Sequence, residues 1–144
     1  MSRLTCFVQV GFLLSAVTAS AASVQLGNIL TRPEAYHLKS VQLRGVATHV
    51  QALSPTPNYK FGTVCVGAYT FILSDETGSI VVEVSSICGR SQEAVTIINE
   101  NQQVSVEVRI EAPGYYTGQG ITPPGEFKST TRAIALREPI VQDR

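Results

Sequence analysis

The segment Phe71–Val84 reads FILSDETGSIVVEV, a pattern typical of two β-strands joined by a tight turn. Asp75 and Gly78 occupy the first and fourth positions of that turn, where a type I turn favours these residue types. A symmetric hairpin that closes between Glu76 and Thr77 predicts which residues face each other along both strands. The expected pairs are Leu73 with Ile80, Phe71 with Val82 and Tyr69 with Val84.

The same register, continued outward, places Cys65 opposite Cys88. A bulge at Gly78 would move the register by one residue and still leave the two sulfur atoms close together. We therefore predict a disulfide between Cys65 and Cys88 across the open end of the hairpin, contributing about 3 kcal/mol by restricting the unfolded chain. The chain has no CxxC motif, and His37 and His49 lack zinc-ligand spacing to either cysteine, so we predict no metal site.

The amino-terminal residues have the pattern of a secretory signal peptide. Arg3 precedes an apolar run over Leu4–Val17, which is followed by the small residues of the sequence ASAA. The run is shorter and more polar than the roughly 20 apolar residues that a membrane-spanning helix needs. We therefore predict a signal peptide over residues 1–21, cleaved after Ala21 or Ala22, and a periplasmic or secreted protein. In that oxidising compartment the two remaining cysteines favour a disulfide.

The rest of the chain, residues 22–144, is long enough for one domain with a single core. Without Arg3, ten basic residues face eleven acidic ones. A nearly neutral surface exerts no general attraction on nucleic acid or anionic lipid. No other segment is apolar and long enough to be expected to span a bilayer.

Five segments in which apolar and polar residues alternate predict five strands of an antiparallel sheet solvated on one side. They cover Val41–Val50, Tyr69–Leu73, Ile80–Val84, Val104–Ile110 and Ile134–Leu136, with Gly45 marking a bulge or bend in the first. Leu26–His37 is expected to form a short helical or turn-like lead-in, and Ser91–Glu100 could hold a helical turn. Long loops are expected over Gln51–Gly67 and Ala112–Lys128.

This arrangement predicts an all-β fold: a five-stranded OB-fold barrel with a short helical element between the third and fourth strands. The alternative is an immunoglobulin-like sandwich. The sandwich is disfavoured because the chain has no Trp, and because the cysteines bracket one hairpin rather than joining two sheets.

Two motifs extend this prediction: Ile29-Leu30…Pro33…Tyr36…Lys39-x-Val41-x-Leu43-x-Gly45 and Phe71-Ile72-Leu73-x-Asp75-x-Thr77-Gly78-x-Ile80. Together they resemble small exported bacterial OB-fold proteins related to the nucleic-acid-binding OB superfamily. Where such lead-ins often have glycine before the lysine, this chain has Leu38. The resemblance covers about Leu26 to Glu138 and implies the barrel, and it carries over no functional residue.

Catalytic chemistry finds little support in the sequence. A hydrolase needs a nucleophile activated by a base, and His37 and His49 are the only histidines, neither within a recognisable motif. The adjacent carboxylates of Asp75 and Glu76 are explained by the turn. No glycine-rich phosphate loop opens a helix. We therefore predict no catalytic residue and no cofactor.

Binding is better supported. OB barrels bind ligands on their second and third strands and on two long loops, and the matching loops of this chain carry aromatic residues beside lysines. Such side chains suit stacking on bases or sugar rings, although they could instead fold inward over the ends of the barrel. The predicted ligand-binding residues are Tyr59, Lys60, Phe61, Tyr69, Tyr115, Tyr116 and Lys128.

The sequence thus predicts an exported, non-enzymatic OB-fold module that binds another envelope protein or a saccharide-like ligand. The alternative is a single-stranded nucleic-acid-binding protein. That alternative is disfavoured because a strand-binding groove normally carries a positive track, whereas the basic residues here alternate with Glu83, Glu107 and Glu111. An enzyme is the least favoured of the three functions.

Overall fold

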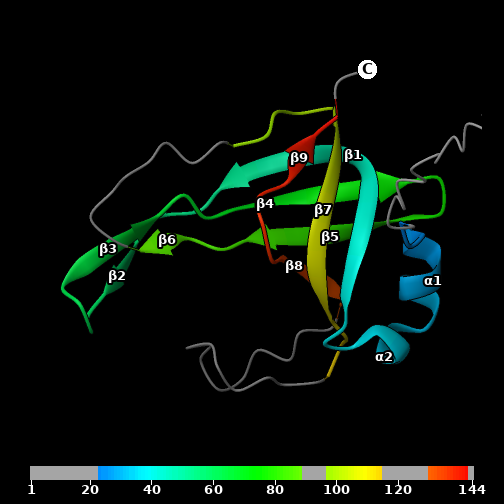
Figure 1. Cartoon of the computed structure of the whole chain (residues 1–144), viewed down its shortest axis with the longest axis horizontal. Coiled ribbons are helices and arrows are strands. Elements are labelled where there is room, and N and C mark those ends of the chain that lie inside the picture. Colours follow the sequence, from blue (N-terminus) through cyan, green and yellow to red (C-terminus); the bar gives the residue numbers. More distant parts are fainter. Residues whose placement is uncertain (1–22, 89–96, 115–129, 143–144) are drawn as a thin grey trace, which may run out of the picture.

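The computed structural model describes residues 23–88, 97–114 and 130–142 (Figure 1). Two short helices, α1 (Leu26–Thr31) and α2 (Pro33–Tyr36), form the predicted lead-in. The predicted signal peptide lies outside the described residues. Of the helical turn expected over Ser91–Glu100, residues 91–96 also lie outside them, and residues 97–100 are not helical.

The remaining elements are strands. They are β1 (Ser40–Ala52), β2 (Thr56–Asn58), β3 (Thr63–Val66), β4 (Tyr69–Asp75), β5 (Gly78–Val84), β6 (Ile87–Cys88), β7 (Gln102–Glu111), β8 (Arg132–Ala135) and β9 (Ile140–Val141). Five of them follow one another around a closed barrel in the order β1-β4-β5-β8-β7, and β7 pairs with β1. The β5–β8 pair is parallel and the others are antiparallel. The predicted all-β, five-stranded, OB-like barrel is confirmed.

The β4–β5 hairpin has the predicted register. Leu73 pairs with Ile80, Phe71 with Val82 and Tyr69 with Val84. The continuation outward is also confirmed, because Cys65 of β3 pairs with Cys88 of β6. The side chains that alternation assigned to the core are buried: Tyr69, Phe71, Leu73, Ile80, Val82 and Val84.

Strand β1 closes the barrel because it pairs with two strands in turn. Its first part, Ser40 to Ala47, lies against β7, and its later part, from Val46 onward, lies against β4. Gly45 lies where β1 crosses over, and a Cβ atom there would lie 2.3 Å from the carbonyl oxygen of Ser74. The bulge itself lies further along, between Thr48 and Gln51. Gly45 is thus a site of close backbone approach rather than the bulge.

The core fills the barrel with side chains from every barrel strand. Tyr69 and Phe71 stack at 6.1 Å between ring centroids, and Leu26 and Ile29 of α1 are fully buried against them and their neighbours. Burial raises the pKa of the Tyr69 hydroxyl, with a further contribution from the charge of Glu138 that outweighs the opposing effect of the Ile98 backbone. The hydroxyl is therefore neutral at physiological pH.

Candidate functional site

A second, three-stranded sheet projects from the barrel at the end opposite α1 (Figure 1). It consists of β2, β3 and β6, in that order, and we call it the ribbon: Thr56–Val66 together with Ile87 and Cys88. The sequence predicted a loop over Gln51–Gly67, and the structure places a β-hairpin there. Alternation over Thr63-Val64-Cys65-Val66 was the available signal, and Pro55 and Pro57 obscured it because proline is rare within strands.

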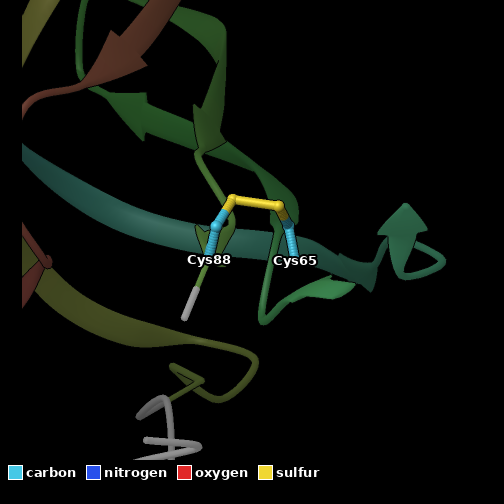
Figure 2. Close-up of a disulfide and its surroundings, with 2 residues drawn as sticks. All are labelled: Cys65 and Cys88. Carbon is cyan, nitrogen blue, oxygen red and sulfur yellow. A yellow bond between two sulfur atoms is a disulfide. The ribbon is translucent and has the colours of Figure 1, made fainter. Parts of the chain in front are cut away.

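The predicted disulfide joins the central strand of the ribbon, β3, to the edge strand β6 (Figure 2). Cys65 on β3 is buried and Cys88 on β6 is exposed. Among the described residues, which stop at Cys88 on this strand, two pairs connect β3 to β6: Cys65 with Cys88 and Val66 with Ile87. Since so short a ladder contributes few hydrogen bonds, the covalent link is the main restraint that keeps β6 beside β3.

The two faces of the ribbon differ in character. Val64 and Val66 alternate along β3 with Thr63 and Cys65, and the β2 and β6 residues that pair with them continue each face. One face is apolar and consists of Pro57, Val64, Val66 and Ile87. Val64 is 53% exposed and Ile87 47% exposed. The ribbon therefore presents apolar area to solvent rather than to the barrel.

The loop that joins β2 to β3 carries three of the predicted ligand-binding residues, Tyr59, Lys60 and Phe61, which we call the ribbon tip. Tyr59 is 90% exposed and Phe61 69% exposed. The Lys60 ammonium lies 5.4 Å from the centroid of the Phe61 ring, within the range of a cation–π contact. Gly62 ends the loop with φ +60°, a conformation that glycine adopts without steric cost.

The ribbon carries one formal charge. Lys60 is the only Asp, Glu, Lys or Arg between Arg44 and Asp75, and none occurs over Ser85–Cys88. A loop this exposed normally contains several charged side chains. The ribbon tip therefore combines two aromatic rings with a single positive charge and no carboxylate.

The other predicted ligand-binding residues do not join this site among the described residues. Tyr69 is fully buried and packs on Phe71 inside the barrel, so it belongs to the core. Its place on a strand that OB barrels use for ligands suggested exposure, but its side chain points to the inner face. Tyr115, Tyr116 and Lys128 lie outside the described residues.

The outer face of β1, β4 and β5 is the surface on which OB barrels stack bases. Here Thr48 pairs with Ile72, and Ile72 with Val81. Next to them Thr70 pairs with Glu83. None of these five residues is aromatic or basic, so this part of the face lacks the stacking platform and the positive track of a single-strand-binding groove.

Neighbouring Arg132 of β8 is held by ion pairs. Its guanidinium donates to the Glu83 carboxylate at 3.2 Å and, through Nε, to the Glu111 carboxylate at 2.6 Å. It thereby joins β8 to the strands on both sides of it. Its charge is compensated within the protein and is not available to an anionic ligand.

The two histidines have structural surroundings. His37 accepts a hydrogen bond from the backbone N–H of Ala112 through Nδ1, at 3.2 Å. His49 lies in the β1 bulge, where its Nδ1 is 3.4 Å from the hydroxyl of the adjacent Thr48. Within residues 23–88, 97–114 and 130–142, no group of three or more His, Cys, Asp or Glu side chains could hold a metal ion.

An open groove of about 620 Å³ lies at the other end of the molecule, between Ser23–Gln25, Arg44–Val46 and the β4–β5 turn. Asp75 lines this groove, but its carboxylate is already occupied by hydrogen bonds from the turn and from the first residue of α1. The groove therefore offers no unpartnered carboxylate at Asp75, and the ribbon tip is the better candidate site.

No protein-family model matches this chain, and no curated protein is significantly similar to it. In the part of the chain that the structure describes, no helix is long and apolar enough to cross a membrane. The candidate site therefore rests on the geometry of the ribbon.

Proposed function

We propose that this protein is an exported, non-enzymatic OB-fold module that binds another envelope protein or a saccharide-like ligand through the ribbon tip. The observation that carries the proposal is the exposure of Tyr59 and Phe61, at 90% and 69%, on a ribbon held by a disulfide. Aromatic side chains supply large contact areas and lose little conformational entropy on binding. Because the ribbon is already ordered, binding does not require it to fold.

Export is part of the proposal. It is supported by the sequence of residues 1–21 and by the disulfide, which persists in oxidising compartments. Sequencing the amino terminus of the protein recovered from its natural host tests it, since cleavage at the predicted site leaves Ala22 or Ser23 as the first residue. A full-length chain that starts at Met1 and retains free thiols would contradict export.

Binding is tested by comparing the native protein with the double variant Tyr59→Ser/Phe61→Ser. Each protein is immobilised and exposed to an envelope extract and to a panel of surface saccharides from the same host. The expected result is a ligand that the native protein retains and the double variant does not. Ile140→Ser is the matched control, because Ile140 is 67% exposed on β9, away from the ribbon. Equal retention by the native and doubly substituted proteins would contradict the proposal.

The second candidate is binding of single-stranded nucleic acid. The observation that favours it is that Lys60 follows the exposed Tyr59 in the sequence and has its ammonium beside the exposed Phe61 ring. Such binding depends on salt, because the phosphate contacts release counterions. A fluorescent oligonucleotide titrated at low salt tests it directly. Absence of binding at micromolar protein would reject this function.

An enzymatic function is the least supported. Purified protein assayed with generic ester, phosphate and peptide substrates is expected to show no turnover. Activity that survives purification and is lost in His49→Ala would overturn the non-enzymatic part of the proposal.

A further inference from the structure

We propose that the ribbon tip is a protruding recognition element that inserts Tyr59 and Phe61 into an apolar pocket of a partner protein whose rim carries carboxylates near Lys60. This inference rests on the proposed function and specifies its partner. It follows from four properties of the ribbon: its shape, its edges, its charge and its limited apolar area.

The shape argues against a small ligand. Sites for saccharides and other small molecules are concave and enclose most of the ligand surface. The ribbon tip lies at the far end of a projecting sheet (Figure 1), and Tyr59 is 90% exposed there. A protruding element needs a partner that supplies the concave surface.

The edges of the ribbon argue against recognition by strand addition, which needs a row of free N–H and C=O groups. Strand β2 forms one edge and contains Pro57 at its centre, directly after Pro55 and Thr56. Proline has no N–H and protects exposed edges from pairing. Strand β6 forms the other edge and, within the described residues, spans Ile87 and Cys88. Recognition must therefore use side chains.

The charge indicates the polarity of the partner. Lys60 is the only charged residue of the ribbon, and its ammonium lies beside the Phe61 ring. When Phe61 enters a pocket, Lys60 reaches the rim, where its charge needs an acceptor because desolvated charges are costly unless they are paired. A carboxylate at the rim supplies it, and a basic rim is excluded by repulsion.

The apolar area favours a protein pocket over a bilayer surface. Tyr59 and Phe61 can bury about 150–250 Å² each, so the two rings together supply about 300–500 Å² of the roughly 800 Å² per partner of a standard interface, which corresponds to a small protein contact. On a bilayer, the same side chains would enter only the interface. Even a whole myristoyl chain there gives marginal, reversible binding, and one lysine adds little.

The first experiment places a photo-crosslinking amino acid, p-benzoylphenylalanine, at position 59, 61 or 140 of the full-length protein in its natural host. We expect positions 59 and 61 to form a discrete adduct with one protein, identified by mass spectrometry, and position 140 to form none. The adduct from position 59 should disappear when Lys60→Glu is added, while Lys60→Arg preserves it.

The second experiment measures the Kd between the purified partner and each variant. Tyr59→Ala and Phe61→Ala should each weaken binding at least tenfold, and Ile140→Ala should leave it unchanged. Lys60→Glu should weaken binding at least tenfold at low salt and less at high salt, because salt screens the repulsion from the acidic rim. Intact protein mass and an unchanged midpoint of thermal unfolding show that each variant is folded with its disulfide formed.

The outcomes separate this inference from the proposed function. Adducts that form only from position 140, or a Kd that Tyr59→Ala and Phe61→Ala leave unchanged, would show a binding module that uses another surface, and the inference would be wrong. Sedimentation with phosphatidylglycerol/phosphatidylethanolamine vesicles that depends on Tyr59 would also overturn it in favour of lipid. Specific retention of a saccharide with no protein adduct would overturn it while preserving the proposed function. Absence of both adducts and saccharide binding would reject both.

Discussion

At the scale of single residues, Asp75 uses both carboxylate oxygens to join the β4–β5 turn to α1. Oδ1 accepts hydrogen bonds from the backbone N–H and the hydroxyl of Thr77, each at 2.6 Å, and from the Gly78 N–H at 3.0 Å. Oδ2 accepts one from the Leu26 N–H at 2.8 Å. The sequence predicted the turn itself, because Asp75 and Gly78 are local turn signals. It could not predict the contact with Leu26, because nothing in the chain shows that a residue 49 positions away lies beside the turn.

Asp75→Asn should lower the free energy of unfolding by about 1–2 kcal/mol at neutral pH, because a charged acceptor for several backbone N–H groups is lost. Burial alone raises the pKa of Asp75, but the hydrogen bonds from Leu26, Thr77 and Gly78 outweigh it and lower the pKa below 3.8. Because the carboxyl pKa is lower in the folded than in the unfolded protein, the ionised carboxylate stabilises the folded state at pH values above the unfolded pKa. This contribution is lost as the pH falls through the lowered pKa of the folded state.

Urea denaturation of both proteins between pH 7 and pH 2 measures this effect. The difference between native protein and Asp75→Asn should be largest at neutral pH and should shrink in acid. The control is Glu76→Gln at the adjacent exposed position. Its free energy of unfolding should differ little from that of the native protein at every pH. A difference that does not change with pH would contradict the assigned role of Asp75.

Leu38 adopts φ +60°, a conformation that disfavours residues with a Cβ atom by about 1–2 kcal/mol. It stands where the resemblance leads one to expect glycine. Leu38→Gly should therefore leave the free energy of unfolding unchanged or raise it by up to about 1 kcal/mol. Leu53 is similarly exposed but has no positive φ. The control variant Leu53→Gly should therefore lower the free energy of unfolding. If urea denaturation shows that Leu38→Gly and Leu53→Gly lose the same free energy of unfolding, the backbone strain assigned to Leu38 is contradicted.

At the scale of elements, the β1 bulge is stabilised by a residue from another segment. The Glu100 carboxylate accepts hydrogen bonds from the His49 N–H at 2.9 Å and the Val50 N–H at 2.7 Å. His49 itself has φ +53°. The backbone N–H of Asn101 donates to the Ala47 carbonyl at 2.8 Å. The segment before β7 thus supplies the partners that the bulge lacks within the sheet.

Glu100→Gln should lower the free energy of unfolding by about 1–2 kcal/mol, because an amide offers only one oxygen to the two N–H groups and carries no charge. Hydrogen exchange should accelerate at His49 and Val50 more than at other β1 amides. Glu76→Gln is again the control, since Glu76 is exposed and lies in the β4–β5 turn. Uniform acceleration along β1 would indicate global destabilisation rather than loss of this contact.

The elements differ in how far the sequence predicted them. The β4–β5 hairpin was predicted in register, because its strands alternate regularly and its turn residues are local signals. The β1 strand was predicted, with a bulge or bend at Gly45. The bulge lies instead between Thr48 and Gln51, and Gly45 was ambiguous because glycine in a strand marks both bulges and close backbone approaches. The β2–β3 hairpin of the ribbon was not predicted. The sequence therefore did not show that Tyr59 and Phe61 lie together on one projecting hairpin.

At the scale of the whole molecule, the barrel closes where β1 passes from β7 to β4. Glycine is required at this crossover because a Cβ on Gly45 would meet the Ser74 carbonyl oxygen at 2.3 Å and its carbon at 2.9 Å. Both are backbone atoms of β4, so relief of the clash would separate two barrel strands. The sequence predicted the five barrel strands but not that Gly45 marks the point at which β1 passes from β7 to β4, because this crossover depends on contacts between residues far apart in the chain.

Gly45→Ala should lower the free energy of unfolding by about 2 kcal/mol or more, because it overpacks a site bounded by backbone. Arg44→Ala at the adjacent exposed position should change it by less than about 0.5 kcal/mol. Urea denaturation gives both values, and amide chemical shifts of β1 and β4 report whether the strands separate. A stable Gly45→Ala variant with native shifts would contradict the assigned role.

The place of β8 in the barrel has a consequence for synthesis. Synthesis and the proposed export both proceed from the amino terminus, so β1, β4 and β5 can pair as a meander before the rest of the chain has followed. β8 lies between β5 and β7 and is the last of the five to be translated. Until Ala135 has emerged, the nascent chain is an open sheet whose unsatisfied backbone groups invite aggregation. A chain arrested before Arg132 should need a holding chaperone, whereas the finished chain should not.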